Sequence, residues 1–252
     1  MTAELNDVDA PVGDGRSLRW VKHRESRRDE LMDAAMEAVR KHGTAVSMDQ
    51  IAAEAKTSKS ILYRYFGEKT GLQLAISERF VRNFTSKALS GLQIEDDVEG
   101  ALLPVIDSFL GLMESDPEIY FFIRLSEFEG YETTDRYINF DSQAEEVALK
   151  AIRAFHPGAN LTTRGRIICR MWADGTVSTV IATGERWLKA RLAVESPERY
   201  GNPNFDETEF QLGRQDRQLI TSYLVTMITR ILSGMVETTW SDPEFGFIEI
   251  PE

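Results

Sequence analysis

The segment 46–69 constrains the fold more than any other part of the chain, because it contains the start signals of two short helices in close succession. Ser47 and Gln50 form a capping box, in which the two side chains satisfy free backbone N–H groups at a helix start. Ser58 then offers a second N-cap, for a helix that runs to about Phe66. Two short helices joined by a tight polar turn are typical of a helix-turn-helix.

The second of these helices places cationic and hydroxyl side chains together. Positions 59, 60, 63 and 64 share one broad face at helical spacing, and the apolar residues between them are available to anchor the helix on the protein. Arg and Lys can donate to guanine in the major groove, whereas Ser and Tyr hydroxyls more often bond phosphate oxygens. The predicted base-edge contacts are Lys59, Ser60 and Arg64, and the predicted phosphate contacts are Ser47, Tyr63, Tyr65 and Lys69.

The stretch 58–69, with its Tyr63-x-Tyr65-Phe66-x-x-Lys69 element, resembles the DNA-binding domain of TetR-type transcriptional regulators. The resemblance covers roughly residues 27–82 and includes a preceding helix from about Asp29 and a following apolar helix. It implies an all-α homodimer whose N-terminal domains bind a near-palindromic operator. It also implies a larger C-terminal domain that binds a small molecule and thereby releases the protein from DNA.

The charge of the chain is distributed unevenly over three predicted regions. Residues 1–15 hold four acidic residues and no basic one, and we expect them to form a disordered tail. Residues 16–82, the predicted DNA-binding domain with a basic N-terminal arm, hold 14 basic and 9 acidic residues. Residues 83–252, the predicted ligand-binding and dimerisation domain, hold 15 and 28. Because salt screens charges beyond about 8–10 Å, the net charge of −12 does not argue against DNA binding.

The basic stretch that opens the second region has two interpretations. In the first, the stretch is an arm or a helix extension from which Arg19, Lys22 and Arg24 reach phosphates or an adjacent minor groove, as the basic arms of other helix-turn-helix proteins do. Alternatively, the stretch is a solvated basic segment with Trp20 packed on the domain. The first regular helix is predicted to start near Asp29 and to end before Gly43 in a left-handed cap.

The remainder of the chain shows helical periodicity and no strict two-residue alternation, which predicts an all-α fold. The segment 196–213 is rich in Pro, Asn, Gly and acidic residues, and is predicted to be a mobile or protruding loop. The predicted helices of this region are Val98–Met113, a helix from Pro117, Thr134–Phe155, a helix from Thr162 or Thr163 to about Val194, and Ile220–Met235.

Two late helices have apolar residues at almost unbroken spacings of three and four. The TetR resemblance implies that such helices form a four-helix interface between two copies of the chain. The alternative is that both line the core of one copy. The predicted interface residues are Trp187, Ile220, Leu224, Met227, Ile231 and Met235.

The aromatic and methionine content between residues 100 and 190 can build a mostly apolar cavity for a small molecule. Its composition favours a lipophilic effector such as a fatty acid or acyl-CoA, with an arginine at an anionic head, although each residue could instead be plain core. The candidate lining residues are Phe109, Met113, Tyr120, Phe121, Arg124, Phe140, Met171 and Trp172.

Neither a metal site nor a catalytic constellation is indicated. The three histidines are scattered, Cys169 is the single cysteine, and no phosphate-binding glycine loop occurs. We therefore expect no metal, no cofactor and no enzymatic activity. The lack of a signal peptide pattern and of a long apolar run predicts a cytoplasmic protein without a membrane partner.

The predicted function is that of a ligand-responsive dimeric repressor, released from operator DNA by a lipophilic effector and connected with lipid metabolism. The alternative is a ligand-independent DNA-binding or architectural protein with a purely structural acidic body.

Overall fold

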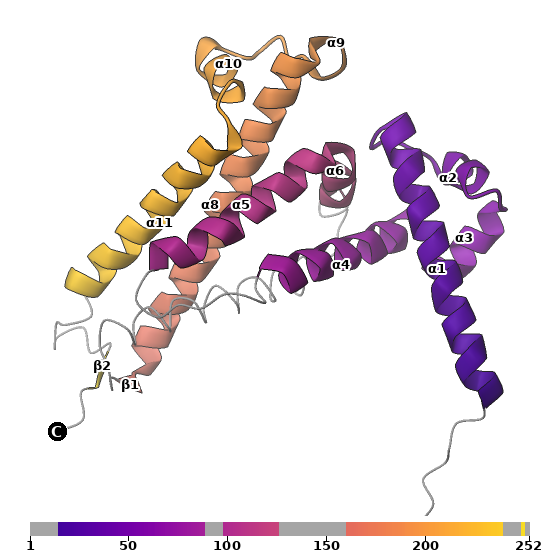
Figure 1. The fold of residues 1–252 in the computed structure, drawn as a ribbon, viewed down its shortest axis with the longest axis horizontal. Coiled ribbons are helices and arrows are strands. Elements are labelled where there is room, and N and C mark those ends of the chain that lie inside the picture. Colours follow the sequence, from indigo (N-terminus) through magenta and orange to yellow (C-terminus); the bar gives the residue numbers. More distant parts are fainter. Residues whose placement is uncertain (1–14, 89–97, 126–159, 239–247, 250–252) are drawn as a thin grey trace, which may run out of the picture. The chain divides into compact units, whose positions relative to one another are not determined.

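The computed structural model describes residues 15–88, 98–125, 160–238 and 248–249 (Figure 1). The chain divides into two compact units, Met1–Ile76 and Ser77–Glu252. Within the described ranges nearly every element is a helix, so the predicted all-α class is confirmed. The small exception is a ladder of two short antiparallel strands, β1 (Asn160–Leu161) and β2 (Ile248–Glu249). The predicted tail 1–15 lies outside the described residues except for its last position.

The first unit is built from α1 (Gly15–His42), α2 (Met48–Glu54), α3 (Lys59–Phe66) and the start of α4 (Lys69–Ala88). Its core joins all four helices, because each contributes side chains that are almost completely buried. These residues are Leu31, Val39, Ile51, Leu62, Leu72 and Ile76.

Helix α1 starts 14 residues before the position predicted from the apolar pattern, at Gly15 instead of Asp29. Of the two forms predicted for the basic stretch, an arm or a helix extension, the structure shows the helix extension. No proline or glycine interrupts residues 16–42, so the backbone has no reason to leave the helix before Gly43. Gly43 has φ +78° and donates its N–H to the Val39 carbonyl at 2.7 Å, as predicted for the left-handed cap.

The second unit contains α5 (Val98–Ser115), α6 (Pro117–Leu125), α8 (Thr163–Glu195), α9 (Pro197–Tyr200), α10 (Glu207–Gly213) and α11 (Arg217–Thr238). The predicted start of α8 is confirmed, since the Thr162 hydroxyl accepts the Gly165 N–H at 3.2 Å. Pro104 lies inside α5 without ending it. The predicted helix 134–155 falls outside the described residues.

The prediction of a long loop at 196–213 is wrong, because two short helices lie within it. Pro197 occupies the first position of α9, where its missing N–H costs nothing. Asp206 caps α10 by accepting the Glu209 N–H at 2.9 Å. The glycine and proline residues that indicated a loop delimit these helices. Gly213 brings α10 against the backbone of α8, where an added Cβ would lie 2.5 Å from the Ala190 carbonyl oxygen.

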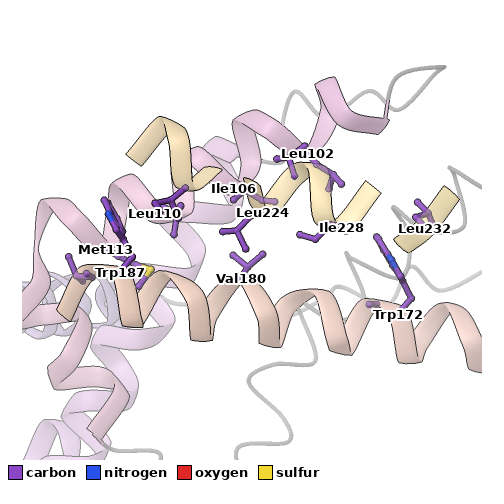
Figure 2. Close-up of a cluster of buried hydrophobic side chains, with 14 of the residues drawn as sticks. Leu102, Ile106, Leu110, Met113, Trp172, Val180, Trp187, Leu224, Ile228 and Leu232 are labelled. Atoms are coloured by element: carbon purple, nitrogen blue, oxygen red, sulfur yellow. The ribbon is translucent and has the colours of Figure 1, made fainter. Parts of the chain in front are cut away.

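The core of the second unit lies between α5, α8 and α11 (Figure 2). Trp187 of α8 is completely buried, and its indole N–H donates to the Gln215 carbonyl at 3.0 Å. Ile220 and Leu224 of α11 are buried in the same cluster. These three residues were predicted to lie in a dimer interface, but the structure encloses them in the core of one chain. Helical spacing alone does not distinguish a core stripe from an interface stripe.

Candidate nucleic-acid interface

The turn between α2 and α3 has the predicted capping geometry. The Ser47 hydroxyl accepts the Gln50 N–H at 3.3 Å, and the Ser47 N–H donates to Gln50 Oε1 at 2.8 Å. Lys56 adopts φ +48°, and the following Thr57 N–H donates to the Ala52 carbonyl at 2.9 Å, which closes the turn. The capping box thus fixes where α2 begins, and the closed turn fixes the start of α3.

Ser58 departs from its predicted role in one respect. Its backbone has the extended conformation of an N-cap, with φ −89° and ψ 151°, but its hydroxyl makes no capping bond to the described backbone. The helix α3 therefore depends on its packing rather than on a side-chain cap.

The two faces of α3 differ sharply in burial. Leu62 is completely buried and Phe66 is 8% exposed, so this side anchors the helix on the unit. The opposite side is exposed, and Tyr63 shows 44% of its surface to solvent. The exposed side chains of this face are Lys59, Ser60, Tyr63 and Arg64. The predicted reading face is thus available for a partner.

Aromatic rings support the C-terminal end of α3. Tyr65 is half-buried, with its ring centroid 6.4 Å from that of Phe66 and 5.6 Å from the Arg64 guanidinium carbon. On the buried side, the Arg28 guanidinium of α1 lies over the Phe66 ring at 5.4 Å. These contacts hold Arg64 and Tyr65 at the edge of the exposed face.

Two lysines, one on α3 and one on α1, are paired with carboxylates of α2. Lys59 Nζ donates to Asp49 Oδ2 at 2.9 Å, and this hydrogen bond, followed by the charge of Asp49, raises the pKa of Lys59. Lys41 lies 3.3 Å from a Glu54 carboxylate oxygen. Lys59 therefore keeps its proton, but it must exchange Asp49 for a new acceptor before it contacts DNA.

Lys69 lies at the first position of α4, as predicted. Its ammonium donates to the Thr44 carbonyl at 3.4 Å and ties the start of α4 to the segment before α2. The side chain is half-buried, so only part of it faces solvent. The free N–H groups of a helix start and this positive charge together favour an anion.

The basic residues ahead of the first buried position extend this cationic surface along α1. Arg19, Lys22 and Arg24 are all exposed, and Trp20 is 72% exposed. Trp20 therefore does not pack on the domain, whereas the exposure of the basic residues fits both interpretations.

Residues 31–76 match the family model described as bacterial regulatory proteins, tetR family. The match spans α1 from its first buried residue, both helices of the helix-turn-helix and the start of α4. The first unit thus contains a domain of the TetR family. This is a family of regulatory proteins, in agreement with the prediction that the chain is not an enzyme.

Known transcriptional regulators resemble this chain over different lengths. An HTH-type transcriptional regulator of Mycobacterium tuberculosis is 38% identical over 111 residues, which are 44% of this chain and 47% of that protein. The HTH-type transcriptional activator FasR of Mycolicibacterium smegmatis is 33% identical over 120 residues, 47% of this chain and 54% of its own length. The chain thus spans about half the length of the curated relatives it matches.

The fold is similar over a longer stretch. The crystal structure of a tetR-family transcriptional regulator from Streptomyces coelicolor aligns with a TM-score of 0.54 at 20% identity, covering 88% of this chain and 86% of that chain. This likeness extends the TetR fold to the second unit.

The predicted ligand-lining residues of the second unit do not all lie together. Met113, Tyr120 and Trp172 are buried in the apolar cluster of the second unit, and Phe109 and Phe121 pack against it. The exception is Met171, which is 67% exposed on α8. It precedes Trp172 by one residue, so its side chain points about 100° away from that of Trp172. Phe140 lies outside the described residues.

The polar candidates of this unit are engaged with one carboxylate. Tyr120 Oη donates to Glu185 Oε1 at 2.8 Å, and Arg124 Nε donates to the same oxygen at 2.5 Å. Arg124 is therefore neutralised by Glu185, which weakens its predicted role at an anionic head group. Sequence reasoning missed Glu185, because its partners lie more than 60 positions away.

One buried donor in the cluster has no described partner. Trp172 is 6% exposed, and its Nε1–H finds no acceptor within the described part of the chain. In Figure 2 its ring extends from α8 toward Leu232 of α11. An oxygen atom placed there would satisfy a buried donor that otherwise costs free energy.

The exposed apolar side chains of the second unit gather on α8 and α11. Met227 and Ile231, both predicted interface residues, are exposed on α11, and Met235 belongs to the same helix. Three further exposed residues of this group were not predicted for the interface, and one of them, Met171, was assigned to the ligand cavity instead. They are Ile167 and Met171 of α8 and Tyr223 of α11.

Among the described residues, no three His, Cys, Asp or Glu side chains lie close enough together to hold a metal ion. Within the same ranges no helix is both long and apolar enough to cross a membrane.

Proposed function

We propose that this chain is a dimeric, cytoplasmic DNA-binding transcriptional repressor that a lipophilic small molecule releases from its operator. The observation that carries the proposal is the two-sided character of α3. Its apolar side is buried in the first unit, and its opposite side exposes a guanidinium, an ammonium and two hydroxyl groups. This is the arrangement that a major-groove helix requires.

The residues of this surface have different roles. Arg64 reads base edges, assisted by Lys59 once Asp49 has released it, and by Ser60. A second group binds phosphates and positions the helix without reading sequence. Its members are Ser47, Tyr63, Tyr65 and Lys69, with Arg19, Lys22 and Arg24 along α1.

A second copy of the chain covers the exposed apolar residues of α8 and α11. Tyr223, Met227 and Ile231 follow one another at intervals of four, so they form one stripe along α11. Strand β1 precedes α8, and strand β2 follows α11. Because the two strands pair with each other, Ile167, near the start of α8, lies at the same end of the unit as Ile231, in the second half of α11. A twofold dimer then holds two recognition helices about 34 Å apart, one turn of DNA.

Effector binding involves the apolar cluster of the second unit. The buried Trp172 N–H supports a ligand that combines an apolar body with a hydrogen-bond acceptor, as a fatty acid or an acyl-CoA does. Release from DNA requires that the ligand bind more tightly to a conformation in which the two recognition helices no longer fit the operator.

The DNA-binding proposal is tested by selecting duplexes from a random pool with the wild-type protein. Arg64→Ala is expected to reduce the preference for the selected site, with a loss of about 5- to 100-fold in the ratio of selected to mixed-sequence affinity. Arg40→Ala removes an exposed charge of the same unit and serves as the matched control. If no duplex is enriched over the starting pool, the proposal is wrong.

The effector proposal is tested by titrating fatty acids and acyl-CoA compounds while operator binding is followed by fluorescence anisotropy. Trp172→Phe keeps an aromatic side chain but removes the donor, and is expected to weaken the response without changing operator affinity in the absence of ligand. Operator binding that persists at saturating concentrations of every compound favours the ligand-independent alternative.

A further inference from the structure

We propose that the first half of α1, residues 16–28, is a phosphate-binding helix that contacts duplex DNA beside the site read by α3 and supplies most of the electrostatic attraction of the first unit. The proposal rests on the proposed function, because it assigns a second element to the same DNA. We call this segment the α1 extension. It separates affinity from sequence selectivity, since the two are carried by different helices.

The charge distribution is the first observation. Residues 16–28 hold six basic residues and one acidic residue, a net charge of +5. Residues 29–82 hold eight of each sign, so the helix-turn-helix and its supporting helices are neutral as a group. The affinity of a protein for DNA rises with the number of phosphates that it neutralises. The α1 extension is therefore the main source of such contacts.

The ion pairs of the helix-turn-helix strengthen this argument. Lys59 is bound to Asp49, and Lys41 to Glu54. When one of these lysines contacts DNA, it exchanges a carboxylate for a phosphate and gains no additional ion pair. Within the α1 extension Arg27 is likewise paired, with Glu30. Arg19, Lys22 and Arg24 are exposed on the part of the helix that precedes its first buried residue.

The shape of the α1 extension is the second observation. It continues α1 past α2 and α3 as one straight helix (Figure 1). Thirteen helical residues span roughly 20 Å. One strand of B-DNA presents a phosphate about every 3.4 Å along the axis, so a helix of this length passes several of them. Every residue from 19 to 26 is exposed.

The orientation of the α1 extension follows from its first contact with α3. Arg28 lies over the ring of Phe66, at the end of α3. Residues four, seven and eight positions earlier share the face of Arg28, and they are Arg24, Val21 and Trp20. The side of α1 that supports α3 thus continues beyond α3 as a face with Trp20 72% and Val21 52% exposed. This face points to the side on which α3 lies.

The pattern of this face fits duplex DNA better than a membrane surface. A helix that lies on a membrane needs a separate apolar face. Here Trp20 and Val21 are about 100° apart around the helix, and Arg24 lies between them. An aromatic side chain surrounded by arginines instead suits a DNA groove edge, where apolar side chains contact sugars or base steps while the cations hold phosphates.

The test uses the full chain with Arg19→Gln, Lys22→Gln and Arg24→Gln combined. Glutamine keeps the helix propensity and removes the charge. Binding to a mixed-sequence duplex and to the selected site is measured by anisotropy over a range of salt concentrations. The slope of log affinity against log salt is expected to become shallower by about 2.7, from about 0.9 for each phosphate contact. The ratio of the two affinities stays within about threefold of wild type.

A control variant combines Arg164→Gln, Arg166→Gln and Lys189→Gln, three exposed cations of α8. It changes the net charge by the same amount and is expected to leave the slope as in wild type. Trp20→Ala is expected to weaken both duplexes by a similar factor without a change of slope, because it removes contact area and no charge.

Three results would overturn the proposal. The first is a slope of log affinity against log salt that equals the wild-type value in the triple Gln variant, while Arg64→Ala still loses selectivity. This result leaves the proposed function intact. The second is binding of the wild type, but not of the variant, to phosphatidylserine vesicles with equal binding of both to duplex, which assigns the helix to a membrane surface. The third is a wild-type protein that binds no duplex, which removes both proposals.

Discussion

The carboxylate of Glu185 is expected to hold α6 on α8, and its removal should destabilise the second unit. Its Oε1 atom accepts both the Tyr120 hydroxyl at 2.8 Å and the Arg124 guanidinium at 2.5 Å. Tyr120 is 3% exposed, so the lost hydrogen bond lies in a buried position. The perturbation is Glu185→Met, which keeps the length of the side chain but removes both oxygens.

The magnitude follows from the burial of the three groups. Breaking a fully buried ion pair costs about 3–5 kcal/mol, which is an upper bound here because the Arg124 and Glu185 side chains retain 20% and 18% exposure. A buried hydroxyl left without a partner costs about 1–3 kcal/mol. Because both donors share one oxygen, the two losses do not add fully. We expect a loss of about 2–4 kcal/mol for Glu185→Met, and about 1 kcal/mol for Glu185→Gln, which keeps one acceptor.

The assay is urea denaturation followed by the fluorescence of the buried Trp172 and Trp187, with Trp20 and Trp240 replaced by Phe. The same two substitutions at the exposed Glu207 serve as controls and should change the free energy of unfolding by less than about 0.5 kcal/mol. Combining Tyr120→Phe with Glu185→Met should cost less than the sum of the two single changes, by about 0.5–3 kcal/mol. Additive effects, or a stability equal to that of the controls, would refute the reasoning.

Three further predictions concern other contacts. Burial, together with hydrogen bonding to Glu118, raises the pKa of Tyr200 to about 12. The folded chain therefore keeps a proton that the unfolded chain loses above pH 10, stability falls between pH 10 and 12, and Tyr200→Phe should flatten this decline in alkaline denaturation curves. Asp49→Asn should free Lys59 and steepen the salt dependence of duplex binding by up to about 0.9, measured by anisotropy. Gly213→Ala should destabilise the chain by about 1–3 kcal/mol in urea, because its methyl group would overlap the backbone of α8.

The helix-turn-helix was predictable because its determinants are local. The capping box of Ser47 and Gln50, the left-handed Gly43 and the spacing within α3 each involve residues fewer than five positions apart. Such signals act in the same way in any surrounding structure. The Asp49–Lys59 pair, which joins α2 to α3, was missed because its two residues meet only after the turn has set the angle between the helices.

The first half of α1 illustrates a different limit. The predicted start at Asp29 followed the apolar stripe, and the stripe does begin near Leu31. The periodicity of apolar residues indicates which face of a helix is buried, however. A helical segment that packs against no other part of the chain has no buried face and so shows no such periodicity. The absence of Pro and Gly from residues 16–42 indicated that the helix begins before Asp29. The basic composition of its first half indicated a negatively charged partner.

The residues of α11 show why a core and an interface could not be separated from the sequence. Leu224, Ile228 and Leu232 form one stripe at intervals of four, and they are buried in the chain itself. Tyr223, Met227 and Ile231 form a second stripe, one residue earlier at each turn and so about 100° away, and they are exposed. Both stripes have the same period, so the pattern merged them into one predicted interface. A helix with two apolar stripes needs cover on two sides. The chain supplies the cover for one side, and the second stripe is the reason for proposing that another copy supplies the other.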